Sequence, residues 1–174
     1  MKHLFFENSL VQQAIIDLNF IGILYSLWDQ INIISKINNI KITIMLKIKN
    51  LTLDCFQHIS FFGNCEIQQR LVNENIYIKD ILCHIISTAG GSGEVDNEIT
   101  FNALEGINGL IYNLSHGLRQ CPSQPQLLLS IKDQMEEQGT VEEYETWIFV
   151  ESGVENRYMG VEAYIGMQSM VSYC

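Results

Sequence analysis

The side chains that could do chemistry are scattered along this chain. The histidines stand singly, and Cys55 with His58 is the one pair at a spacing that could hold a metal ion. A closed structural zinc site needs four ligands, so this pair would supply at most half of one. Cys83 and His84 are adjacent, and on a helix such side chains diverge by about 100°. We therefore predict no metal site and no cofactor.

Two further motifs are weak candidates for catalysis. The run Gly90-Gly-Ser-Gly93 lacks the Gly-Lys-Ser/Thr ending of a phosphate-binding loop, and it follows a predicted helix where that loop would follow a strand. The acidic pairs Glu136-Glu137 and Glu142-Glu143 lie in a hydrophilic stretch, without the apolar pocket that a catalytic carboxylic acid needs. The sequence therefore indicates a protein that is not an enzyme.

The elements that position these residues include an internal repeat with an offset of 56 residues. Segment 8–19 returns as segment 64–75, with identical residues at Asn8/Asn64, Gln12/Gln68, Gln13/Gln69 and Asn19/Asn75. Self-similarity over tens of residues is typical of stacked repeats, whose neighbouring units bury a shared core.

Apolar residues at helical spacing predict an all-α fold. Besides the two repeat copies, the predicted helices are Ile21–Trp28, Leu51–Phe62, Ile76–Ile86, Ile99–Leu114, Leu127–Gln138, Val141–Val150 and Tyr158–Ser172. We expect burial between the repeats for Phe56, Ile59, Leu71, Leu104, Ile107 and Ile111. Gly106 and Gly109 lower helix propensity, and they suit a place where a neighbouring helix approaches closely.

Turn-forming residues organise residues 1–174, which we treat as one domain. Residues 89–97 read as a polar, glycine-rich linker. Residues 117–125, with a glycine and two prolines, form the strongest boundary and precede a third, degenerate repeat. Neither end of the predicted stack has a polar cap, so the chain is either a piece of a longer array or is covered at its ends by another molecule.

Residues 31–50 differ from the rest of the chain in composition. Sixteen of the twenty positions are Ile, Asn or Lys, and none is acidic. Their removal would shorten the repeat offset from 56 to 36 residues, so we predict an insertion between the second and third helices of the first repeat, with translated intervening sequence as one origin. The alternatives are a longer second helix, or a short strand over 41–49, where β-branched residues alternate.

Charge is distributed unevenly. The net charge is −10, and residues 90–174 carry thirteen acids against Arg119, Lys132 and Arg157. Binding to a phosphate backbone needs clustered lysine and arginine, so we expect no nucleic acid partner.

The cysteines and the apolar stretches bear on location. The five cysteines are odd in number and lack a Cys-x-x-Cys pair, so we expect no disulfide framework and a reducing, cytoplasmic location. Neither 10–28 nor 31–48 is a clean apolar run of about twenty residues, so we expect no insertion into a membrane.

Three helices per unit, the Val/Ile-Gln-Gln of the first helix and the tail Leu110-Ile-Tyr-Asn-Leu-Ser115 together resemble the armadillo repeat. The resemblance covers 8–64 and 64–116 as two repeats and 125–173 as a degenerate third. It implies a right-handed α-solenoid of about three repeats that binds protein.

The resemblance also implies one binding residue. Asn113 matches the groove asparagine, which in many armadillo proteins bonds the backbone of an extended peptide. Cys65 and Tyr173 stand at the aligned positions of the other two repeats, so an unbroken asparagine ladder is absent. The glycine that the family has between its first two helices is missing as well.

A thinner resemblance exists to the homology-associated helical domain of inositol-trisphosphate and ryanodine receptors. It depends on the order of Gln68-Gln69, Gly90-Gly-Ser-Gly93 and Gln120-Cys-Pro122. It implies a helical domain of a calcium-release-channel-like protein as an alternative.

The acidic end predicts the binding surface. Between residues 133 and 162 nine acids face a single base, Arg157, and such repulsion disfavours the compact state unless a partner offsets it. We expect this end to meet a basic partner surface through Glu136, Glu137, Glu142, Glu143 and Glu145. The predicted function is a protein-binding scaffold or adaptor within a hetero-assembly, and the alternative is a structural subunit buried in a complex.

Overall fold

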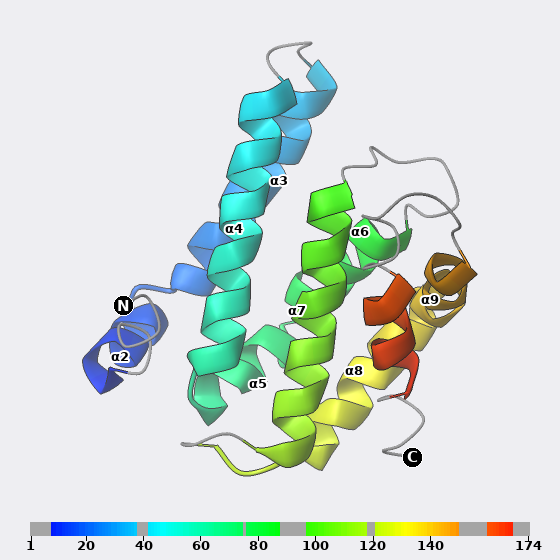
Figure 1. Ribbon diagram of the computed structural model, residues 1–174. Coiled ribbons are helices and arrows are strands. Elements are labelled where there is room, and N and C mark those ends of the chain that lie inside the picture. Colours follow the sequence, from blue (N-terminus) through cyan, green and yellow to red (C-terminus); the bar gives the residue numbers. More distant parts are fainter. Residues whose placement is uncertain are drawn as a thin grey trace.

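The computed structural model describes residues 8–37, 42–74, 76–87, 97–117, 121–149 and 160–168. Within these ranges 90% of the residues are helical and none forms a strand, so the prediction of an all-α fold is confirmed (Figure 1). The predicted glycine-rich linker lies almost entirely outside the described residues.

The helices follow the chain in this order: α2 (Ser9–Asp17), α3 (Phe20–Ile37), α4 (Ile42–Phe62), α5 (Cys65–Asn73), the π-helix η1 (Ile76–Cys83), α6 (His84–Ile86), α7 (Asn97–His116), α8 (Pro125–Glu137), α9 (Thr140–Phe149) and a helix over 160–168. At the boundary after α7, Gly117 has a φ of 74°, which favours glycine, and α8 then starts on Pro125.

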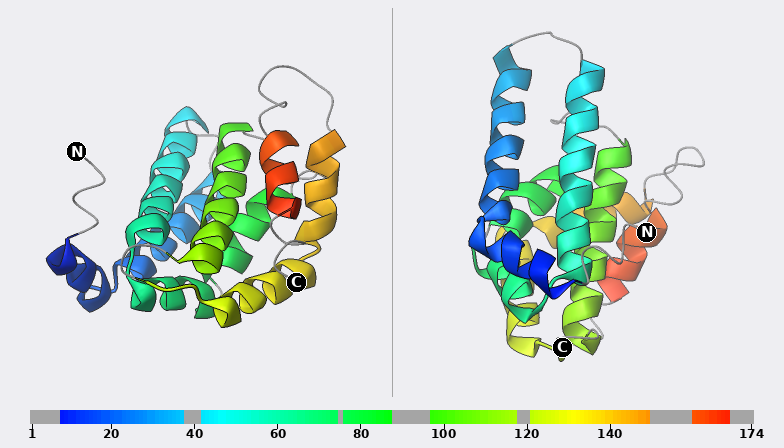
Figure 2. Two further views of the ribbon diagram at one scale, coloured as in Figure 1. Left: turned by 60° about the horizontal axis from the view of Figure 1, so that its bottom comes forward. Right: turned by 90° about the vertical axis from the view of Figure 1, so that its left-hand side faces the viewer.

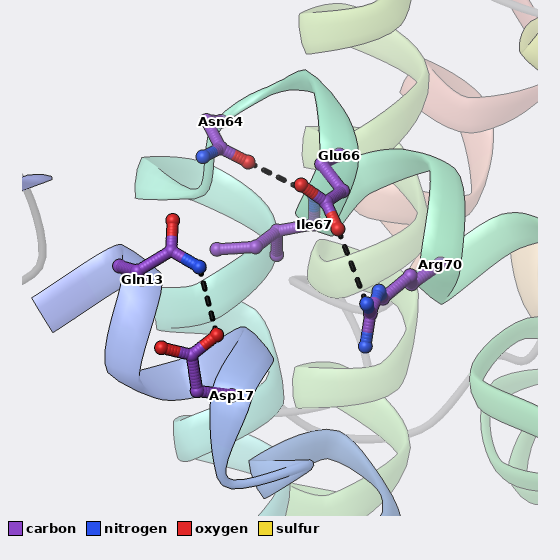
Figure 3. A network of polar contacts seen from close by, with 6 residues as sticks. All are labelled: Gln13, Asp17, Asn64, Glu66, Ile67 and Arg70. Atoms are coloured by element: carbon purple, nitrogen blue, oxygen red, sulfur yellow. Dashed lines mark hydrogen bonds and ion pairs between the residues drawn. The ribbon is translucent and has the colours of Figure 1, made fainter.

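Two of the repeated asparagines start helices of equal length. The Asn8 side chain accepts a hydrogen bond from the Leu10 amide at 2.9 Å. The Asn64 side chain accepts one from the Ile67 amide at 3.0 Å, which Figure 3 shows. Each caps a nine-residue helix, α2 and α5 respectively. An asparagine at this position satisfies an amide that would otherwise lack a partner. The 56-residue repeat in the sequence is therefore also a repeat of local structure.

Asn19 makes the turn between α2 and α3. Its φ is 48°, in the left-handed region that asparagine tolerates better than other residues with a side chain. Its side chain lies over Gly22, where an added Cβ would stand 2.5 Å from the Asn19 Nδ2 atom. Asparagine thus takes the place of the turn glycine whose absence the sequence shows.

The Ile/Asn/Lys-rich segment is helical wherever it is described. Residues 31–37 end α3 and residues 42–50 begin α4, so the alternative of a short strand over 41–49 is wrong for the described residues. The two helices run side by side and extend beyond their neighbours as a hairpin (Figures 1 and 2). Lys49 lies over the ring of Trp28, with Nζ 5.9 Å from the ring centroid, and this contact joins the two helices. Helix α3 continues to Ile37, as in the alternative of a longer second helix, and α4 starts earlier than the predicted Leu51. An insertion at this point stays a prediction.

Three pairs of helices that are far apart in the sequence pack together. α4 lies against α7, α5 against α8, and α6 against α9. The helix over 160–168 lies against α7, because Asn108 donates to the Glu162 backbone carbonyl at 2.8 Å. The expected core is confirmed: the side chains of Phe56, Ile59, Leu71, Leu104, Ile107 and Ile111 are all buried.

Close packing of α4 on α7 explains one of the helix-interior glycines. A Cβ built on Gly109 would stand 2.1 Å from Cζ of Phe61, so the aromatic ring occupies the space that any side chain would need. The expectation that this glycine permits a close approach of helices is confirmed.

Cys65 and Cys121 form a disulfide, with their Cα atoms 5.2 Å apart. The cysteine count and spacing predict no disulfide framework, and they did not predict this bond. The sequence rule counts cysteines and their local spacing, whereas these two are 56 residues apart and meet because α5 packs against α8. Cys55 and Cys83 are not part of a disulfide.

Among the described helices, none is by itself long and apolar enough to cross a membrane. Helix α2 together with residues 20–34 passes such a test by length and composition, but the two helices are bent by 59° relative to each other.

Candidate functional site

The predicted binding carboxylates gather around one turn. Helix α8 ends at Glu137, Gly139 turns the chain with a φ of 65°, and α9 begins at Thr140. Glu136 therefore lies in the last turn of α8, and Glu142 lies in the first turn of α9. We call this group of five carboxylates (Glu136, Glu137, Glu142, Glu143 and Glu145) the acidic turn.

Most of the acidic turn is open to solvent. Glu136, Glu137, Glu142 and Glu145 are exposed, whereas Glu143 is half-buried. The Oε2 atom of Glu143 is buried and has no hydrogen-bond partner among the described residues. Four of the five carboxylates can therefore meet a partner without any change of structure.

One carboxylate already has a counter-ion. The Lys79 ammonium of η1 donates to Oε2 of Glu137 at 2.9 Å, and this bond together with the charge of Glu137 raises the pKa of Lys79. The pair is exposed, and such surface ion pairs contribute little to stability. Within the described residues, no ion pair reaches Glu136, Glu142 or Glu145.

The helix dipole has opposite effects on the carboxylates of α8 and of α9. Glu142 and Glu143 lie near the α9 N-terminus, where the helix dipole favours negative charge by about 0.3–1 kcal/mol each. Glu136 and Glu137 lie near the α8 C-terminus, where the same dipole opposes it. A cation from a partner would therefore offset the largest unfavourable charge interaction at the α8 carboxylates.

Asn113 is separate from the acidic turn. It lies on α7, and its side chain is only 3% exposed. Its Nδ2 atom has no hydrogen-bond partner among the described residues. Contact between Asn113 and a peptide would require its covering side chains to move, and its role in binding stays a prediction.

The Cys55 and His58 pair does not meet further ligands in the described part of the chain. The His58 ring packs edge-on against Phe62, with ring centroids 6.2 Å apart. Among the described residues, no group of three or more histidine, cysteine or acidic side chains is placed to hold a metal ion.

A buried polar contact joins α7, α9 and the helix over 160–168. Asn108 donates to the Glu162 carboxylate at 3.0 Å, and the Tyr144 hydroxyl is 3.5 Å from the Asn108 amide oxygen. Partial desolvation, with the nearby charges of Glu162 and Asp54, raises the pKa of Glu105 on α7. Sequence patterns do not reveal such contacts, because the residues involved are tens of positions apart.

Comparisons with protein-family models, curated proteins and solved structures found no match to this chain.

Proposed function

We propose that this chain is a non-enzymatic protein-binding scaffold whose acidic turn binds a basic surface of a protein partner. The observation that carries the proposal is that the five carboxylates flank the single turn between α8 and α9. Among the described residues only Glu137 has a counter-ion, which is Lys79. Complementary charge of this kind mainly raises the rate of association and selects the partner.

The packing of equivalent helices supports a right-handed α-solenoid of about three armadillo-like repeats as the architecture of this scaffold. In such a stack each unit contacts its neighbours only, and successive units present a continuous surface. The contacts of α4 with α7 and of α5 with α8 have this form. We further propose that the scaffold works within a hetero-assembly.

A cytoplasmic location is part of this proposal, and the Cys65–Cys121 disulfide weighs against it. Disulfides persist mainly in oxidising compartments. Alkylation of free thiols at the moment of cell lysis, followed by mass analysis, decides the matter. Cytoplasmic protein is expected to have both cysteines alkylated.

The second candidate function is that of a structural subunit buried among neighbours. Exposed aliphatic side chains such as Leu10, Leu18 and Leu51, which are 78%, 68% and 62% exposed, favour it. A scaffold is expected to stay soluble by itself, whereas an obligate buried subunit is expected to aggregate without its neighbours.

The binding proposal is tested with a fluorescent lysine-rich peptide as probe. We expect the association rate to fall markedly between low and physiological salt, because ions screen exposed charges. The double variant Glu142→Lys, Glu143→Lys should slow association further while circular dichroism stays unchanged. If neither added salt nor this charge reversal changed the association rate, the acidic turn would be excluded as the binding site.

A further inference from the structure

The Cys65–Cys121 disulfide has a hydrogen bond beside it that joins the same two parts of the chain. The two cysteines are 56 residues apart, which is the offset of the internal repeat. Gln68 and Gln124 are separated by the same interval, and Gln124 Nε2 donates to Gln68 Oε1 at 2.6 Å. A covalent bond and a hydrogen bond thus hold the segment that precedes α8 on helix α5.

The segment that the disulfide holds lies largely at the surface. Within residues 121–124, Pro122 and Ser123 are exposed and Gln124 is half-buried. The backbone amide of Gln124 donates to the Leu114 carbonyl at 2.7 Å, which ties the segment to the end of α7. The disulfide is therefore the covalent attachment of a surface segment to α5.

The two cysteines of the bond differ in exposure to solvent. Cys65 is partly exposed as the first residue of α5, whereas Cys121 is only 3% exposed. Thiol–disulfide exchange requires that the attacking thiolate reach one of the two sulfur atoms. An external thiolate is therefore expected to attack the Cys65 sulfur, with the Cys121 sulfur as the leaving group.

A donor is already directed at that leaving sulfur. Gln124 Nε2 lies 3.0 Å from Cys121 Sγ and donates a hydrogen bond to it. The carboxamide oxygen of Gln68 accepts from the same nitrogen and so holds the donor in position. A hydrogen bond to a charged acceptor is stronger than one to a neutral acceptor. This contact therefore strengthens as negative charge develops on the departing Cys121 sulfur.

We propose that the Cys65–Cys121 disulfide is a reversible redox switch that a small-molecule thiol of the glutathione class opens. A glutathione thiolate attacks the Cys65 sulfur, the protein disulfide breaks, and Cys121 leaves as a thiolate that takes up a proton from water. A second glutathione thiolate attacks the sulfur of the bound glutathione and releases glutathione disulfide and the Cys65 thiolate, which is protonated in turn. Two electrons pass from two glutathione molecules to the protein, and the reverse reaction with glutathione disulfide closes the bond.

Opening the bond changes how the connection between α7 and α8 is held. The covalent attachment of residues 121–124 to α5 is lost, and the hydrogen bonds of Gln124 remain. Helix α8 begins directly after this segment, at Pro125, and packs on α5 and η1. Reduction should therefore loosen this connection while the helices stay folded. The acidic turn lies at the other end of α8, so the switch and the proposed function can fail separately.

The first experiment locates the site of attack in the full wild-type chain. The oxidised protein is incubated with reduced glutathione, quenched with acid at successive times, digested, and mapped by mass. The transient glutathione adduct should be on Cys65, and both cysteines should then become free thiols. Added glutathione disulfide should restore the bond. An adduct on Cys121, or a thiol number that glutathione does not change, would overturn the proposal.

A second experiment tests the donor at the leaving sulfur. Gln124→Leu removes the hydrogen bond to Cys121 Sγ, so reduction by glutathione should be about tenfold slower. Gln69→Leu is the matched control, because Gln69 is an exposed glutamine of α5, and it should react at the wild-type rate. If Gln124 only held the segment in place, its loss would open access to the disulfide and speed reduction. Circular dichroism checks the fold, and an equal or faster rate in folded Gln124→Leu would contradict the assigned role.

Amide hydrogen exchange then tests whether the bond acts as a switch. A peptide spanning residues 121–128 should exchange at least about fivefold faster in the reduced wild-type chain than in the oxidised one, because local opening is easier without the attachment. Cys121→Ser is the control, since it cannot form the bond and its exchange should not respond to glutathione. Equal exchange of the oxidised and reduced wild-type chains would reject the switch.

Discussion

Residues far apart in sequence decide the tightest contact of the fold. Gly109 on α7 faces the Phe61 ring of α4, and a Cβ there would stand 2.1 Å from Cζ. We expect Gly109→Ala to lower the free energy of unfolding by about 1–3 kcal/mol, because overpacking forces the ring or the helix to shift. Urea unfolding measures the change. Combining it with Phe61→Leu should recover part of the loss, and a strictly additive double variant would contradict the contact.

The disulfide makes a second prediction at this scale. It closes a long loop, since Cys65 and Cys121 are 56 residues apart. Its loss through Cys65→Ser should lower the free energy of unfolding by about 4 kcal/mol in the chain-entropy estimate. Addition of reductant to the wild type should have a similar effect. Cys55→Ser is the control, because Cys55 is not in a disulfide. Equal unfolding midpoints with and without reductant would argue against the bond.

Glu105 makes the stability depend on pH. Its folded-state pKa is raised above the ordinary 4.5, so the folded chain holds this proton more tightly than the unfolded chain does. The contribution of Glu105 to stability is therefore best at acidic pH and is lost as pH rises through the raised pKa. Glu105→Gln should stabilise the chain slightly at pH 7 and leave it unchanged near pH 3. Denaturant unfolding at both pH values checks this, and an effect of the opposite sign would contradict it.

The sequence predicted single residues well where burial follows helical periodicity. Phe56 and Leu104 are fully buried as expected, because an inward position on a periodic helix needs no knowledge of its neighbour. The Cys65–Cys121 bond and the pairing of Lys79 with Glu137 were missed, because they depend on which helices lie side by side.

At the scale of elements, periodicity located the helices but misjudged the length of two. The lysine-rich start of α4 is rich in β-branched residues, whose strand preference is only a weak prior that packing overrides. The contact of Lys49 with the Trp28 ring is one packing interaction that favours helix here. The Asn-based repeat did predict equivalent helices, since both asparagines cap them.

The hairpin gives the element-scale prediction. Replacing 33–47 by a four-residue glycine-serine linker should cost less stability than Leu104→Ala. The segment contains exposed residues such as Ile33, Ile34 and Ile44, whereas Leu104 is fully buried. Leu104→Ala should lower the free energy of unfolding by about 2–5 kcal/mol. Thermal and urea unfolding compare the two variants. If the linker variant were unfolded while Leu104→Ala had the stability of the wild type, the account would be contradicted, and the core would include the hairpin.

At the scale of the whole molecule, the exposed carboxylates at the α8–α9 turn are the feature on which the binding proposal depends. The sequence predicted the acidic end from its composition, because an excess of carboxylates needs no fold to be visible. The predicted helices Leu127–Gln138 and Val141–Val150 already placed these carboxylates on either side of one turn, and the structure adds the left-handed backbone of Gly139 at that turn. The sequence also placed Asn113 in a groove by resemblance, and the side chain is buried.

The most direct test of the binding account compares two triple variants with equal net charge. The first neutralises the acidic turn with Glu136→Gln, Glu142→Gln and Glu145→Gln. The second neutralises exposed acids elsewhere with Asp29→Asn, Glu74→Gln and Asp80→Asn. Both change the net charge equally, so long-range attraction falls by a similar amount in each.

Equilibrium titration of the lysine-rich peptide at about 150 mM salt then separates a site from a general charge effect. The account predicts that the acidic-turn variant binds the peptide at least about tenfold more weakly than the control variant, which is about 1.4 kcal/mol of binding free energy. Equal affinities of the two triple variants would contradict it.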